Sequence, residues 1–407
     1  MATVAWLGGA PAVPKVLTHV PTDTTVYTLL MDGSSDIVIT FSAGPGVPAA
    51  CKSIRDAING NAISQGETER TGTGATVGEF SLLRATLDDE TTPTLVWITG
   101  PADGRPFTLT LNAVSGTTIQ TQTGPHHFDN TENWSSGTVP VDDDVLLFDE
   151  RAVSSLKYAI DLTGTRYEAT VTQGFKHEIG LADVYQANNA LLNFDETLPK
   201  ALTFDDPLSG GADIQIGQGT GVGSSLVRIT VVGQANFLVA GSGSRKATNI
   251  PPVLLIGGAS SSLVQTGGDI AVGYYETETA TLATVELTGD TSRLEIGGGC
   301  SLATLTMDAG TVRCRDLPSG NIDVYGGVFY CQFTGSGAEI HVSGGAVVDF
   351  TEDPRARTFT KIILYKGAAW IDPQGSVTST ALELHGTKPN EVTISAPSHR
   401  KWTIAAI

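Results

Sequence analysis

The stretch that decides the fold begins with ATVELTGDTSRLEIGGG (283–299) and continues through SLATLTMDAGTVRCRDLPSG (301–320), NIDVYGGVFYCQFTGSG (321–337) and AEIHVSGGAVVDF (338–350). These segments combine short alternating runs with glycine-rich corners. Matching positions recur at a nearly constant spacing, since Cys314 in TVRC corresponds to Cys331 in VFYC, and Ile322 in NIDV corresponds to Ile340 in EIHV. Repeats at this spacing predict the stacked coils of a β-solenoid, in which each coil buries its apolar face against the next. An antiparallel meander with similar turns is the alternative.

The composition limits the classes of partner that we expect. Acidic residues outnumber basic residues 43 to 24, which gives a formal net charge of −19. Phosphate backbones and anionic lipids repel such a chain, so we expect neither nucleic acid nor a membrane as a partner. The first residues, MATVAWLGGAPAV, lack the basic region and the long apolar run of a signal peptide. We therefore expect a protein that is made in the cytoplasm.

The fold class that we predict is mainly β: a small N-terminal α+β domain followed by a right-handed parallel β-helix, or solenoid. The expected strand and helix order of the small domain is ββαβββ, with one sheet and the helix Pro48 to Asn61 across its face. We divide the chain into an extended arm (1–22), the small α+β domain (23–118), a junction that caps the solenoid (119–150), the β-solenoid (151–385) and a C-terminal cap or subunit-contact segment (386–407).

The arm is marked by Trp6, Gly8, Gly9 and Pro11. Such arms either pack on their own body or reach a neighbouring molecule. We expect the arm and the small domain to form the attachment region.

Trp134 stands in the junction phrase NWSSGTVP, shortly before the apolar run VLLF (145–148). A terminal coil exposes apolar residues and strand edges, so we expect Trp134 to cover the open end of the solenoid. Cys314 and Cys331 are expected to lie one coil apart, either as buried reduced thiols or as a disulfide.

Two groups of residues are candidates for metal binding. Asp142, Asp143 and Asp144 carry the oxygen ligands that Ca²⁺ takes, but they lack the spacing of an EF-hand loop, so we interpret them as a solvated turn. His126 and His127 point in different directions on an extended chain and have no evident third ligand. We therefore expect no cofactor, with Ca²⁺ as the weak alternative.

The residues best suited to catalysis lie in the segment VVDFTEDPRAR (347–357). A polysaccharide hydrolase or lyase of the β-helix type needs paired carboxylates, or carboxylates with a basic side chain. The candidates are Asp349, Glu352, Asp353, Arg355 and Arg357. The aromatic content, 7%, is low for a sugar-binding groove. We therefore interpret the segment as a salt-linked surface or a subunit contact and expect no enzyme.

Two phrases carry a resemblance to known proteins. AWLGGAPAVPKVLTHVPT (5–22), followed by a ββα pattern, and NWSSGTVPVDDDVLLF (133–148) resemble uncharacterised phage and prophage proteins, especially those of planctomycete-type bacteria. In those proteins a small N-terminal domain precedes a β-helix. The resemblance covers the segment 1–150 by phrase, and its motifs mark architecture without catalytic residues to transfer.

The resemblance implies a virion structural protein: a capsid decoration or head-fibre protein, or a tail-spike component, at the virion surface. The β-helices of virions commonly trimerise, so a homotrimer bound to a capsid or other virion protein is expected, by analogy. Two alternatives stay open. One is a tail-spike-like protein that binds or degrades a cell-surface glycan, and the other is a bacterial surface adhesin.

Overall fold

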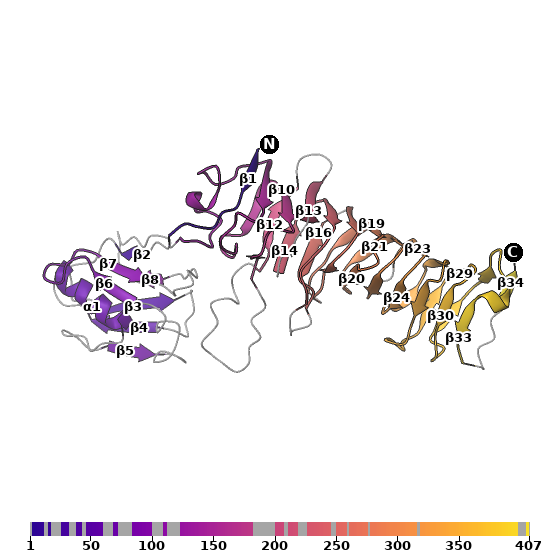
Figure 1. The fold of residues 1–407 in the computed structure, drawn as a ribbon. Helices are drawn as coiled ribbons and strands as arrows, with labels where there is room; N and C mark the ends of the chain where they lie inside the picture. The colour runs from indigo at the N-terminus through magenta and orange to yellow at the C-terminus, as the bar shows by residue number, and fades with distance from the viewer. Residues whose placement is uncertain are drawn as a thin grey trace.

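The computed structural model of the protein describes residues 2–11, 15–17, 26–31, 38–42, 46–59, 68–71, 84–99, 109–111, 123–181, 200–206, 211–218, 226–245, 250–258, 260–275, 277–315, 318–397 and 404–406. These residues form a small domain and a long stack of parallel strands, with the first strand of the chain, β1 (Thr3–Ala5), at one end of the stack and the last, β34 (Ile404–Ala406), at the other (Figure 1). The stack is a parallel β-solenoid of about ten turns over residues 144 to 395.

Two long sheets run the length of the solenoid. After β1, sheet 1 contains β9 (Asp144–Phe148), β10 (Asp161–Thr172), β13 (Ala212–Gln218), β15 (Ala235–Val239), β17 (Ser261–Gln265), β19 (Thr281–Leu287), β21 (Ser301–Met307), β23 (Asn321–Val324), β26 (Glu339–Val342), β29 (Lys361–Leu364), β32 (Leu382–Leu384) and β34.

Sheet 2 contains β11 (Glu178–Ile179), β12 (Leu202–Asp205), β14 (Leu226–Val231), β16 (Val253–Gly257), β18 (Asp269–Val272), β20 (Arg293–Ile296), β22 (Thr311–Cys314), β24 (Val328–Cys331), β27 (Val347–Asp349), β30 (Ala369–Ile371) and β33 (Thr393–Ser395). A short third sheet joins β25 (Gly335–Ser336), β28 (Arg357–Phe359) and β31 (Val377–Ser379). Each pairing within these three sheets is parallel, which confirms the solenoid and excludes the meander.

The interior is built of columns of apolar side chains, one from each coil. In sheet 2 the successive partners Leu294, Val312, Phe329, Val348 and Trp370 are all buried. Strand residues alternate between buried and more exposed positions, as a one-sided sheet requires. The apolar surface of each coil is therefore covered by its neighbours.

Cys314 and Cys331 are partners in the register of β22 and β24, one coil apart as predicted. Both are buried, and neither forms a disulfide. Their packing in the interior is that of small apolar side chains.

The N-terminal segment differs from the predicted single arm. Its β1 pairs in parallel with β9, and Trp6 is buried directly after it. Lys15–Leu17 forms β2, which pairs antiparallel with β7 (Val96–Thr99) of the small domain. The prediction of one arm over residues 1–22 is therefore wrong, because these residues are divided between two bodies. The small domain is an insertion between the first two strands of the solenoid.

The small domain contains the predicted helix as α1 (Val47–Asn59), with Cys51, Ile54 and Ile58 buried along one face. Its strands form two antiparallel sheets, in the orders β5 (Thr68–Thr71), β4 (Val38–Ser42), β3 (Val26–Met31), β8 (Leu109–Leu111), and β2, β7, β6 (Arg84–Leu87). The expectation of one sheet is wrong, because β2 and β6 pair on either side of β7 and complete a second sheet. Helix α1 contacts strands of both sheets.

At the other end, the parallel pairing continues past the predicted boundary at residue 385. Strand β33 pairs with β30, and β34 pairs with β32. Much of the segment 386–407 therefore extends the solenoid, and the basic residues 399–401 lie outside the described residues. Within the part of the chain that the structure describes, no helix is long and apolar enough to cross a lipid bilayer.

Candidate functional site

The outer face of sheet 2 carries charged residues in register. Asp269 of β18 is the partner of Arg293 in β20. One position along the face, Glu295 is the partner of Arg313 in β22, which is the partner of Tyr330 in β24. Because paired strands lie about 4.8 Å apart, each of these side chains stands beside the next along the solenoid axis. The sequence repeat thus creates a charged strip on the surface.

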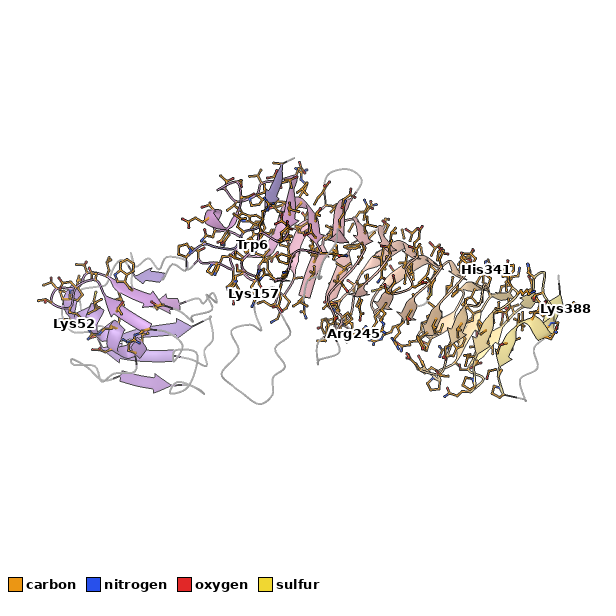
Figure 2. The ribbon with its side chains drawn as sticks, viewed as in Figure 1. Trp6, Lys52, Lys157, Arg245, His341 and Lys388 are labelled. Carbon is orange, nitrogen blue, oxygen red and sulfur yellow. The ribbon has the colours of Figure 1, made fainter. Side chains whose placement is uncertain are left out.

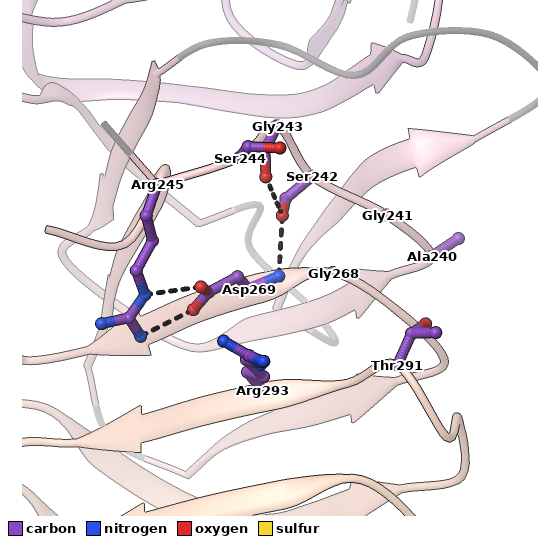
Figure 3. A pocket seen from close by; sticks show the side chains of 10 residues that line it. All are labelled: Ala240, Gly241, Ser242, Gly243, Ser244, Arg245, Gly268, Asp269, Thr291 and Arg293. Carbon is purple, nitrogen blue, oxygen red and sulfur yellow. Dashed lines mark hydrogen bonds and ion pairs between the residues drawn. The ribbon is translucent and has the colours of Figure 1, made fainter. Parts of the chain in front are cut away.

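Arg245 joins this strip from the loop after β15. Its guanidinium is bound by two carboxylates. Nη2 lies 2.8 Å from Oδ1 of Asp269 (Figure 3). The same atom lies 2.6 Å from Oε1 of Glu295. The hydrogen bond to Asp269 is the largest cause that raises the pKa of Arg245 above its ordinary value, so the group is positively charged throughout the usable pH range. Arg245 lies on one edge of the solenoid, and His341 of β26, in sheet 1, lies on the other (Figure 2).

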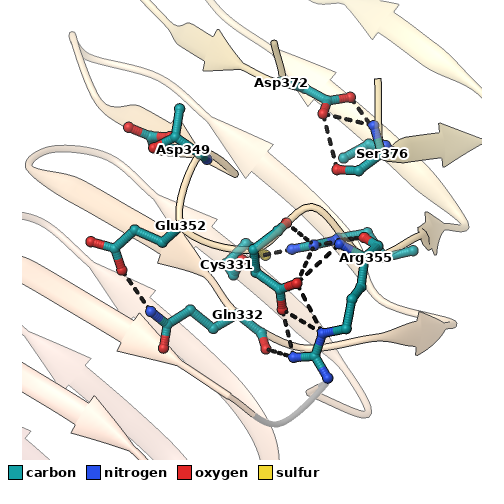
Figure 4. A network of polar contacts seen from close by, with 11 residues as sticks. Cys331, Gln332, Asp349, Glu352, Arg355, Asp372 and Ser376 are labelled. Carbon is teal, nitrogen blue, oxygen red and sulfur yellow. Dashed lines mark hydrogen bonds and ion pairs between the residues drawn. The ribbon is translucent and has the colours of Figure 1, made fainter. Parts of the chain in front are cut away.

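A second network lies further along the same face. Nη2 of Arg313 is 3.0 Å from Oε1 of Glu352. The amide of Gln332 donates to Oε2 of Glu352 at 2.6 Å (Figure 4). The guanidinium carbon of Arg313 lies 4.7 Å from the centre of the Tyr330 ring, which is a cation–π distance. The hydrogen bond that Arg313 donates to Glu352 raises the pKa of Arg313 above its ordinary value.

Three hollows, with volumes of about 600, 400 and 520 Å³, lie along the surface beside the residues of these two networks. The first and second share Arg245 and Arg293, and the second and third share Tyr274, Arg315 and Gln332. They therefore lie next to one another along the solenoid. We call this row of hollows the arginine groove, and its defining residues are Arg245, Tyr274, Arg293, Arg313, Arg315 and Gln332.

Two arginines of the groove carry charge that is incompletely neutralised. The guanidinium of Arg293 has no ion pair or hydrogen bond among the described residues, as Figure 3 shows for its immediate surroundings. Arg315 has an ion pair with Glu295 at 4.0 Å and a hydrogen bond to Gln332 at 3.3 Å. Both arginines are exposed. The middle hollow of the groove thus presents positive charge on a chain whose net charge is −19.

Three of the five catalytic candidates, Glu352, Asp353 and Arg355, line the far end of this groove, where each is held in a salt link. Arg355 binds Asp353 through both carboxylate oxygens (Nε–Oδ1 2.9 Å, Nη2–Oδ2 2.6 Å). This pairing is the largest cause that lowers the pKa of Asp353 below its ordinary value. Oδ1 of Asp349 accepts the backbone N–H of Thr351 at 2.8 Å. Glu352 is bound to Arg313 and Gln332, as above.

Arg357 lies beneath the loop that carries these candidates and is buried. Its guanidinium donates to the backbone carbonyls of Cys331 (2.6 Å) and Arg355 (2.7 Å) and stacks on the ring of Phe350. These contacts stabilise the turn that connects β27 to β28. Arg357 is therefore a structural residue of the loop, and the structure places it away from solvent.

Asp142, Asp143 and Asp144 are each bound by donors of the protein itself. Arg166 lies 3.3 Å from both Asp142 and Asp143, and Asp144 accepts the backbone N–H groups of Ala2 (2.9 Å) and Val141 (3.1 Å). Because Asp144 receives the amide of Ala2, this turn fixes the start of β1. No group of three or more metal-type ligands occurs among the described residues.

The rings of the two adjacent histidines both lie beside the ring of Tyr158. Nδ1 of His126 lies 2.9 Å from the carbonyl of Ser155. His127 packs against the ring of Tyr158 at 5.1 Å, and its Nδ1 is 3.8 Å from Asp129. The two rings belong to the packing of the junction.

The open end of the solenoid is covered by aromatic side chains, with Trp134 among them as predicted. Its ring lies 5.1 Å from that of Trp6 and 4.8 Å from that of Phe128, both edge-on, and its Nε1 donates to the carbonyl of Phe128 at 2.7 Å. Trp6, named as part of an attachment arm, is buried here. Of the other arm residues, Gly8 adopts a left-handed conformation (φ +69°) and Gly9 and Pro11 follow it along the described segment.

Sequence reasoning missed Asn133, which is buried at this end. Its Nδ2 donates to the carbonyls of Gly124 (2.8 Å) and His127 (2.9 Å), and its Oδ1 accepts the backbone N–H of Ala10 (2.9 Å). One side chain therefore ties together segments that lie far apart in the sequence. Asn133 could have been noticed because it precedes Trp134 in the Asn-Trp-Ser phrase, from which only Trp134 was predicted to have a structural role.

Sequence reasoning also missed the arginine groove. Its residues come from several different coils, from position 245 to position 332, and no short motif joins them. The signal was the repeat itself: Glu295, Arg313 and Tyr330 occupy equivalent places in successive second runs. Comparison of the chain with protein-family models, curated proteins and solved structures finds no match.

Proposed function

We propose that this chain is a non-enzymatic structural protein of a phage virion, of the capsid-decoration or head-fibre type, and that its solenoid is displayed at the particle surface. The observation that carries the proposal is the parallel ladder of about ten turns with a filled apolar interior. Such a ladder forms a stiff rod because each coil is bonded to the next along its length. The resemblance of the segment 1–150 to phage proteins supports the same role.

The small domain is the attachment element in this proposal. Both chain connections to it leave from the same end of the solenoid, since it is inserted between β1 and β9. Trp6 is buried against Trp134 and is occupied by the chain's own contacts. The small domain, in contrast, exposes the large ring of Trp97, which is 38% accessible. An exposed aromatic residue of this kind is a common anchor in protein interfaces.

The first test is whether the chain is part of purified particles. Particles from a culture that produces the protein are banded by density, and the chain is detected by mass spectrometry and by immunogold labelling. The proposal expects the chain at a fixed copy number per particle, with label on the outer surface. Recovery of the chain only in the soluble fraction would overturn it.

Attachment through the small domain is tested by adding full-length variants to particles from which the protein has been removed. Trp97→Glu places a charge on the small domain, and it is expected to reduce rebinding at least tenfold if Trp97 is an anchor. Tyr325→Glu is the matched control, since Tyr325 is 45% accessible but lies on the solenoid. Equal loss in both variants would contradict attachment through the small domain.

The homotrimer that the resemblance implies is part of this proposal. Light scattering of the purified chain, with and without EDTA, is expected to give three times the chain mass of 42.4 kDa under both conditions. A monomer would remove the trimer from the proposal. Dissociation by EDTA would instead assign a metal ion a role in assembly.

A further inference from the structure

We propose that the arginine groove binds an extended acidic polysaccharide, one that carries carboxylate or sulfate groups along its chain. This inference goes beyond the proposed virion role, and it neither needs that role nor follows from it. It rests on the length of the groove, on its charge and on the way its side chains are held.

The groove has the shape of a polymer site. It crosses the strands β18, β20, β22, β24 and the end of β27, and four steps of about 4.8 Å between neighbouring strands give a length of about 19 Å. The three hollows share lining residues, so they are adjacent along the solenoid. A small ion would occupy one hollow, whereas an extended chain can contact all three.

The charge of the middle hollow suits an oxyanion. Arg245, Arg293, Arg313 and Arg315 line the middle hollow, with Glu295 as the one acidic residue of that lining. Guanidinium groups bind carboxylate and sulfate oxygens through paired N–H donors. Arg245 and Arg313 are fixed by their own carboxylate partners, while Arg293 and Arg315 are exposed. The two exposed arginines are therefore the expected contacts with the ligand.

A sugar chain fits this surface better than a nucleic acid does. A protein of net charge −19 repels nucleic acids and acidic polysaccharides alike over long distances, so the preference for a sugar chain rests on the aromatic face beside the arginines. Tyr274 adds an apolar face to the groove. Its ring lies edge-on to Tyr275 at 5.0 Å, and Tyr275 is anchored by a hydrogen bond from Arg228. A positioned aromatic face beside polar groups is typical of a site that packs against a sugar ring.

The test is isothermal titration calorimetry of the full chain with four polymers at low salt. Polygalacturonate presents carboxylates, dextran sulfate presents sulfates, dextran is neutral, and duplex DNA presents phosphates. The proposal expects binding to one or both acidic polysaccharides and none to dextran. Which of the two binds tells carboxylate from sulfate. No binding to either, or binding to DNA as tight as to the polysaccharides, would overturn the proposal.

The site is located with Arg293→Gln/Arg315→Gln. Because each exposed guanidinium is expected to donate charged hydrogen bonds to the ligand, loss of the two contacts is expected to weaken binding at least tenfold. The control is Arg151→Gln, which removes an exposed arginine that pairs with Asp149 outside the groove. Circular dichroism is expected to show native folding in both variants, since these side chains face solvent. Unchanged affinity in the double variant, or equal loss in the control, would overturn the assignment to the groove.

The length of the groove gives a second, independent readout. Affinity for oligogalacturonates, or for sulfated oligosaccharides, is expected to rise with the number of sugars until the chain fills the groove and then to level off. A single-ion site would give the same affinity for the monosaccharide and for the longer chains. That result would overturn the polymer site while leaving an anion site.

Discussion

The N-terminal end of the solenoid and its middle coils are held together in different ways. At the end, the side chain of Asn133 and the indole of Trp134 form hydrogen bonds with backbone groups, including that of Ala10, which lies far away in sequence. In the middle, stability comes from apolar columns such as Leu294, Val312 and Phe329, in which each coil repeats the contacts of the last. The end is therefore one interlocked unit, whereas the middle is modular.

In the middle coils, the residues that stabilise the fold are therefore different from those that form the charged surface. Because the middle coils are stabilised by their interior, their outward positions are free to carry the charges of the arginine groove. Arg293 and Arg315 face solvent there without any structural requirement that the fold imposes on them. At the N-terminal end, polar groups are buried and necessary, so substitutions there act on the fold itself.

The largest effect is expected for Asn133→Ala. It removes three hydrogen bonds and leaves the buried backbone N–H of Ala10 without a partner, so the free energy of unfolding should fall by about 3 kcal/mol. The matched control is Asn236→Ala on the outer face of sheet 1, where about 1 kcal/mol or less is expected. Urea unfolding, followed by circular dichroism, gives both values. Equal costs would erase the contrast between the end and the middle.

A pair of tryptophan substitutions sharpens the same contrast. Trp134→Phe removes a hydrogen bond to Phe128, whereas the Nε1 of Trp370, in an apolar column of sheet 2, has no partner among the described residues. Both rings are buried among aromatic side chains, so the loss of volume is matched. Trp134→Phe is expected to destabilise the protein by about 1–2 kcal/mol more than Trp370→Phe. A larger cost at Trp370 would reverse the ranking.

The acidic loop beside the groove gives a smaller, pH-dependent effect. Arg355 lowers the folded-state pKa of Asp353 below the unfolded value of about 3.9, so the pair stabilises the fold above about pH 4 and the contribution is lost as the pH falls through the folded pKa. Arg355 is 65% exposed, so solvent screens the pair.

The corresponding variant is Asp353→Asn. At pH 7 it should be less stable than the wild type by about 1 kcal/mol or less, and the difference should shrink toward zero by about pH 2. Asp290→Asn, at an exposed turn, is expected to show no such convergence. The prediction is tested by measuring the urea midpoint of unfolding for each protein between pH 2 and pH 7. A stability difference between the wild type and Asp353→Asn that stays constant over this range would contradict the prediction.

The smallest expected effect concerns the buried cysteine thiols, which should not react with a thiol reagent in the folded protein. Cys300, Cys314 and Cys331 are buried, as is Cys51 of α1, and burial raises the pKa of the Cys331 thiol. Ellman's reagent should therefore react with none of the four cysteines in the native protein and with all four after unfolding without a reductant. Two reactive thiols after unfolding would instead indicate a disulfide.

The repeat was enough to predict the solenoid, and the helical periodicity was enough to predict α1. Val312 and Phe329 alternate with polar neighbours at a constant spacing, and such local patterns survive in the fold because each coil faces the same environment. The failures were long-range pairings. Nothing local indicates that Thr3–Ala5 lies beside β9, or that Lys15–Leu17 lies beside β7, since pairing partners are chosen by the three-dimensional arrangement.

The candidate site also has one part that the sequence predicted and one part that it did not. The segment around Asp353 and Arg355 was visible because its charges are adjacent in the chain. The groove was not, because Arg245, Arg293 and Arg315 come from different coils and meet only when the coils stack.

By itself, the sequence determined the β-rich class, the coil repeat, the acidic net charge and the aromatic cap at Trp134, because each of these depends on composition or on residues close together in the chain. Only the tertiary structure decided that the first strand belongs to the solenoid, that Asn133 binds three backbone groups and that arginines gather on sheet 2. The physical reason is that coil stacking brings residues of successive coils, far apart along the chain, to within about 5 Å of each other. Small differences in the length of each corner decide which of them meet.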